Sequence, residues 1–82
     1  MKLSAAQIAV LERLANPGEF LHYMHWGLDN YFSWNGMKGR NPNIRTVFKL
    51  HDLGLVDYRR DSLGYPSTAR ITDAGRKALE VR

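Results

Sequence analysis

Apolar residues recur at helical spacing in the first part of the chain. Ser4 fits a helix N-cap, and Gln7, three residues later, fits its partner in a capping box. Apolar residues from Ile8 to Leu14 then fall on one face of a helix. The Asn-Pro-Gly sequence at 16–18 ends the pattern. We therefore expect a structural helix that begins after Ser4.

The same period returns between Pro42 and Leu53 and predicts a second helix. Pro42 suits the first helical position after Asn41 as N-cap, while Asn43 is a competing cap. Gly54 fits the left-handed residue that commonly follows a helix. The stripe that we expect to face the core consists of Ile44, Val47 and Leu50.

Alternation with a period of two follows the second helix. It covers residues 56–60 and 68–71, and the turn residues at 61–64 join these two predicted strands into a ribbon. A last helix is then expected, with Thr72 as its N-cap and Asp73 as a favourable charge in its first turn.

Residues 19–40 carry six aromatic side chains without a clear period. The sequence FLHYMHW fits a helix and a strand about equally well, so its pattern leaves both open. We expect residues 19–34 to form a short helix with extended flanks. The Asn-Gly pair at 35–36 is typical of a turn.

Length and charge add two constraints. A chain of 82 residues predicts one small domain over residues 1–82. Residues 38–82 hold ten Lys or Arg and five Asp or Glu, a sum of +5, whereas residues 1–37 sum to −1. The basic charge is therefore local, as a surface that binds a polyanion requires.

The composition also narrows the compartment. There are no cysteines, which excludes disulfides and cysteine-based metal sites. No apolar run approaches membrane-spanning length, and the N-terminal residues lack the apolar core of a secretory signal. We expect a cytoplasmic protein without a membrane partner, associated with the nucleoid if it binds DNA.

Two stretches give the chain a resemblance to a known family. TVFKLHDLGLVDY looks like a recognition helix running into a wing strand, and ARITDAGRKAL looks like a second wing strand running into a closing helix. Residues 44–60 and 68–80 thereby resemble the winged helix-turn-helix domains of bacterial and phage transcription regulators. The resemblance implies an α+β fold with about three helices and a C-terminal two-stranded β wing. The departure is SWNGMKGRNPN, which stands where that fold needs a second helix.

The resemblance implies a double-stranded DNA-binding protein, a transcriptional regulator of phage or mobile-element type. The helix at 42–53 would enter the major groove, and the wing at 56–71 would contact the backbone or the minor groove. Arg45 suits guanine O6 and N7 because its guanidinium donates two hydrogen bonds. The predicted DNA-binding residues are Lys38, Arg40, Asn43, Arg45, Thr46, Lys49, Arg59, Arg60 and Arg70.

The same residues leave other functions open. A protein-interaction module without DNA binding would use Phe48, Leu53 and Leu63 as its contact patch. The aromatic cluster from Phe20 to Trp34 would alternatively stack the bases of a single strand. A homodimer and a monomer both fit the pattern.

Catalytic and metal chemistry find little support in the sequence. His22 and His25 are three residues apart and could share a helical face, and the fold could bring His51 to them. This is weak evidence for a zinc site, because there is no H-E-x-x-H pattern. No carboxylate pair or phosphate-binding glycine loop stands in a recognisable context. We therefore predict no enzyme, no metal site and no cofactor.

Overall fold

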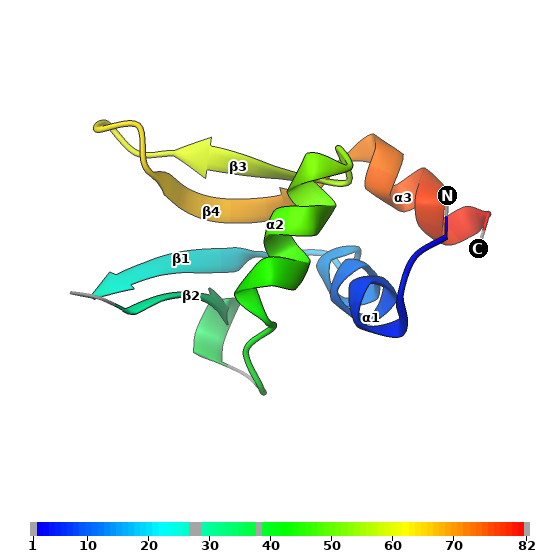
Figure 1. Cartoon of the computed structure of the whole chain (residues 1–82), viewed down its shortest axis with the longest axis horizontal. Helices are drawn as coiled ribbons and strands as arrows, with labels where there is room; N and C mark the ends of the chain where they lie inside the picture. The colour runs from blue at the N-terminus through cyan, green and yellow to red at the C-terminus, as the bar shows by residue number, and fades with distance from the viewer. Residues whose placement is uncertain (1, 27–28, 38, 82) are drawn as a thin grey trace.

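The computed structural model describes residues 2–26, 29–37 and 39–81. These residues form three α-helices, one short 3-10 helix and four strands (Figure 1). The elements are, in chain order, α1 (Ala5–Leu14), β1 (Leu21–Trp26), β2 (Asp29–Trp34), η1 (Asn35–Met37), α2 (Ile44–Asp52), β3 (Val56–Arg60), β4 (Pro66–Ile71) and α3 (Asp73–Glu80).

The four strands form one antiparallel sheet in the order β2-β1-β4-β3. It consists of two hairpins, the N-terminal hairpin (β1–β2) and the C-terminal hairpin (β3–β4). Strands β1 and β4 join them through the pairs Leu21 with Ala69 and His22 with Thr68. The hairpins are thus paired at one end and extend side by side toward the other (Figure 1).

The predicted winged helix-turn-helix architecture, with a C-terminal two-stranded wing, is wrong. The sheet has four strands, and two of them lie between α1 and α2, where a helix-turn-helix requires a helix. The expected helix within residues 19–34 is also wrong, because β1 and β2 occupy most of these residues. The sequence pattern failed to predict these strands because both faces of β1 carry large side chains. Leu21 and Tyr23 face α2 while His22 and Met24 face the other way, so the period of two is concealed.

Helix α2 lies across one face of the sheet, which we name the inner face (Figure 1). Its buried residues Val47 and Leu50 pack into the same core as Phe32 and Leu21. Helices α1 and α3 pack at the end where the hairpins are joined (Figure 1). Each fully buried side chain of this size contributes about 1.5–3 kcal/mol to folding. The opposite face of the sheet, the outer face, carries no helix among the described residues (Figure 1).

Local capping explains where the helices begin. The capping box of α1 is confirmed, since Gln7 N–H donates to Ser4 Oγ at 3.1 Å and Ser4 N–H to Gln7 Oε1 at 2.8 Å. Helix α2 begins two residues later than expected, because Asn43 is its N-cap. The backbone of Asn43 is extended, and its side chain accepts a hydrogen bond from Arg45 N–H at 2.8 Å. Thr72 caps α3 as predicted.

Candidate nucleic-acid interface

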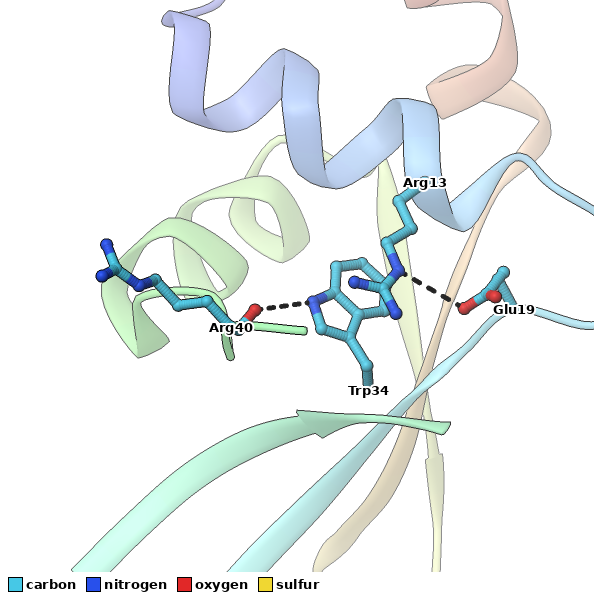
Figure 2. A network of polar contacts seen from close by, with 4 residues as sticks. All are labelled: Arg13, Glu19, Trp34 and Arg40. Carbon is cyan, nitrogen blue, oxygen red and sulfur yellow. Dashed lines mark hydrogen bonds and ion pairs between the residues drawn. The ribbon is translucent and has the colours of Figure 1, made fainter. Parts of the chain in front are cut away.

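A polar network fixes the loop that leads into α2 (Figure 2). Trp34 Nε1 donates a hydrogen bond to the Arg40 carbonyl oxygen at 3.1 Å. The Arg13 guanidinium lies over the Trp34 ring, 4.1 Å from its centroid, and Arg13 Nε is 3.6 Å from a Glu19 carboxylate oxygen. Gly39, at φ +82°, lets the chain pass close to this arginine. The N-terminus of α2 is therefore held against both α1 and the sheet.

One strip of α2 is left facing solvent. Arg45, Lys49 and Asp52 are exposed and lie opposite the buried residues of the helix, and Phe48 lies at the edge of this strip, with its ring against Phe32. Neither Arg45 nor Lys49 forms an ion pair within the described parts of the chain. Arg45 and Lys49 are one helical turn apart, so both cations point away from the sheet on the same side. This strip agrees with the face expected from the sequence.

The arginines of the C-terminal hairpin do not lie together. Arg59 and Arg70 alternate with residues buried under α2, so they lie on the outer face, where they line one hollow with Asp57. The Arg70 guanidinium is 4.5 Å from the centroid of the Phe20 ring. The register of β3 and β4 shifts between Arg59 and Arg60, and Arg60 Nη1 donates to the Gly64 carbonyl oxygen at 3.0 Å, so the Arg60 guanidinium lies at the turn of the hairpin. The sequence-predicted set is therefore not one surface.

The other predicted site residues lie around the start of α2. The side chain of Arg40 is exposed, while its carbonyl oxygen is bonded to Trp34. The side-chain oxygen of Asn43 is used as the helix cap. Thr46 is half-buried and lines a hollow beside α1, away from the exposed strip. Lys38 lies outside the described residues. Of the predicted cations, Arg45 and Lys49 are the two that α2 itself presents, and Arg40 lies in the loop before the helix.

A row of rings connects α2 with the C-terminal hairpin and was missed by the sequence analysis. His51 and Tyr58 stack in parallel, with centroids 4.0 Å apart and planes 2° apart. Phe32 lies 5.9 Å from both Phe48 and Tyr58, measured between ring centroids. These contacts fix the position of the helix on the hairpin. The sequence did place Tyr58 at an inward position of VDYRR. Its ring partners could not be predicted, because they come from segments far apart in sequence.

The half-buried phenol of Tyr58 has a raised pKa. Burial, with smaller contributions from Asp52 and Tyr23, raises its pKa to about 12, and Arg60 acts in the opposite direction. The phenol is therefore protonated across the physiological range. Its hydroxyl is shielded from solvent and has no hydrogen-bond partner among the described residues.

The histidines do not assemble a metal site. His22 and His25 lie on opposite faces of strand β1 rather than on one face of a helix. His51 is stacked on Tyr58. No group of three potential metal-ligating side chains comes together in the described part of the chain.

Comparison with known proteins adds no relative: no family model, curated protein or solved structure matches the chain. No helix in the described ranges is both long and apolar enough to span a membrane. The chemistry of the exposed side chains on α2 and the C-terminal hairpin is therefore the basis for a functional hypothesis.

Proposed function

We propose that the protein binds double-stranded DNA through α2 and the neighbouring C-terminal hairpin. The observation that carries the proposal is the pair Arg45 and Lys49, two exposed cations one turn apart on a helix held firmly against the sheet. A transcriptional regulator of phage or mobile-element type, working in the cytoplasm, is the role in which we expect this activity. The proposal contains no catalytic step.

The dimensions and charges support this choice. The major groove of B-DNA is about 12 Å wide and admits one α-helix. On α2, Arg45 would donate two hydrogen bonds to guanine O6 and N7, while Lys49 would meet a phosphate. Arg60, at the turn of the C-terminal hairpin, would add a phosphate contact. Asp52, at the C-terminal end of the strip, carries a negative charge that would repel phosphate, so the surface favourable for DNA ends there.

The proposed contact set is narrower than the sequence suggested. Arg59 and Arg70 lie on the outer face of the sheet, and Arg70 is held over Phe20. A duplex that contacts α2 cannot also meet that face without wrapping around the sheet edge. We therefore assign the DNA contacts to Arg45, Lys49 and Arg60, with Arg40 at the entrance of the helix.

A fluorescence-anisotropy titration with a random-sequence duplex, repeated over a salt series, tests the proposal. Lys49→Ala is expected to weaken binding at low salt and to reduce the slope of log K against log salt by about 1. Lys77→Ala is the matched control, because Lys77 is also exposed but lies on α3, away from α2's exposed strip. Equal effects of the two variants would show that only net charge matters, and would overturn the assignment to α2.

A protein partner is the second candidate, favoured by the 40% exposure of Phe48 at the edge of the α2 strip. Absence of duplex binding even at low salt would refute the DNA proposal. A function that survives Arg45→Ala and Lys49→Ala but is lost in Phe48→Ala would then favour this candidate.

A further inference from the structure

The turn of the C-terminal hairpin is held by a dense set of hydrogen bonds. The Asp61 carboxylate accepts from Leu63 N–H at 2.9 Å and from Tyr65 N–H at 3.0 Å. Asp61 N–H also donates to the Tyr65 carbonyl oxygen at 2.9 Å. Gly64, at φ +87°, donates to the Asp61 carbonyl oxygen at 3.0 Å, and Arg60 Nη1 donates to the Gly64 carbonyl oxygen at 3.0 Å. The turn therefore satisfies several of its backbone hydrogen bonds internally.

The turn holds a leucine out into water. The Leu63 side chain is 80% exposed and that of Tyr65 is 61% exposed. The hydrogen bonds of the turn use the backbone of Leu63, not its side chain, so a polar residue would serve the turn equally well. Burying a leucine side chain contributes about 1.5–3 kcal/mol to stability, and Leu63 does not make this contribution in the free protein because its side chain is exposed. A single exposed leucine is ordinary, but one at the tip of an arginine-bearing hairpin is placed for contact.

The turn is connected to α2 through ring contacts, and its length brings Leu63 within reach of a second groove. Tyr65 stacks on His25 with ring centroids 6.3 Å apart, which joins the base of the turn to the ring row that leads back to α2. Leu63 is five residues beyond Tyr58, the residue stacked on α2, and five extended residues span at most about 17 Å. Half a turn of B-DNA, which separates a major groove from the next minor groove, is also about 17 Å.

We propose that Leu63 is a wedge that enters the minor groove and kinks the DNA held by α2. Apolar side chains, leucine among them, open a base step when inserted from the minor groove and bend the duplex by about 20–90°. Tyr65 would lie against the sugar-phosphate chain, and Arg60 would neutralise a phosphate beside the turn. The inference rests on the proposed function and extends it from DNA binding to DNA bending.

Energy transfer between dyes at the two ends of a short duplex measures the bend directly. Binding of the unaltered protein is expected to bring the ends together by a kink within the range of about 20–90°. Leu63→Ala is expected to bind with the same salt slope but to leave the duplex nearly straight. Leu63→Phe keeps a large apolar wedge and is expected to retain the bend. Val81→Ala is the control, since Val81 is 83% exposed and follows α3, far from the turn in sequence.

A second measurement uses the cost of deforming the DNA. A duplex with a central TA step is unstacked more easily than one with an A-tract, so the unaltered protein is expected to prefer it. Leu63→Ala is expected to lose this preference. Binding without bending, or full bending by Leu63→Ala, would overturn the wedge while leaving the proposed DNA binding intact. Absence of duplex binding by the unaltered protein would overturn both.

Discussion

The two hairpins of the sheet have the same antiparallel pairing but contribute different side chains to the core and to the surface. The N-terminal hairpin places Leu21, Phe32 and Trp34 in the core and is exposed at His25 and from Asp29 to Tyr31. The C-terminal hairpin is buried at its base, where Val56 and Ala69 pack, and exposed from Arg59 to Tyr65. Both hairpins are thus structural where they are joined and exposed toward the other end, but the larger core side chains come from the N-terminal hairpin and the exposed arginines from the C-terminal one. Stability and binding should therefore be separable by mutation.

The largest effect is expected from Phe32→Ala in the N-terminal hairpin. Phe32 is fully buried and contacts the rings of Tyr23, Phe48 and Tyr58. Removing the ring leaves a cavity and should cost about 3–5 kcal/mol of unfolding free energy, measured by urea titration. A domain of this length has a total stability of only about 4–12 kcal/mol, so the variant would be marginally folded.

Two exposed controls sharpen this difference between the hairpins. Tyr31→Ala, next to Phe32 but on the outer face, should cost no more than about 1 kcal/mol. Leu63→Ala at the tip of the other hairpin should change stability by less than about 0.5 kcal/mol. A loss at Leu63 comparable with that at Phe32 would mean that the tip is a structural element and not a contact surface.

The next effect is a difference between two neighbouring arginines of the C-terminal hairpin. Arg59 and Arg60 are both exposed, but Arg59 lies on the outer face, whereas the Arg60 guanidinium is bonded to the Gly64 carbonyl oxygen at the turn. Arg60→Ala is expected to lower the salt slope of DNA binding by about 1, whereas Arg59→Ala should leave it unchanged. Both variants remove one positive charge from β3, and anisotropy titrations compare them; because Arg60→Ala also removes a hydrogen bond of the turn, a urea titration of that variant checks that the fold is kept. A larger effect of Arg59→Ala would move the interface to the outer face.

Sequence patterns located the elements whose signals are local. The caps at Ser4 and Thr72 and the stop at Gly54 depend on neighbouring residues, and the structure has each of them. The C-terminal hairpin was also predictable, because its inward and outward residues differ clearly in polarity. The N-terminal hairpin was not, because rings and apolar side chains stand on both faces of β1.

The candidate site was predictable only in part for a related reason. Arg45 and Lys49 share a helical face at a spacing that any α-helix fixes, so their common exposure could be read from the sequence. Arg59 and Arg70 required the strand register and the position of α2, which assign them to the outer face. The contact of Arg13 with Trp34 joins α1 to β2 and depends on tertiary packing alone.

The smallest expected effect concerns Tyr58, where the base of the C-terminal hairpin meets α2. Its pKa is raised from 10.0 to about 12 in the folded protein, chiefly by burial. Below pH 10 the phenol is protonated in both states and adds no pH dependence. Between pH 10 and about 12 the unfolded state ionises first, so the free energy of unfolding should fall as the pH rises.

In Tyr58→Phe this pH-dependent component should be absent. The variant should also be at least as stable as the unaltered protein near neutral pH, because the lost hydroxyl has no described partner. Urea titrations of both proteins across this window measure the difference, and parallel curves would show that Tyr58 is not shielded at the contact with α2.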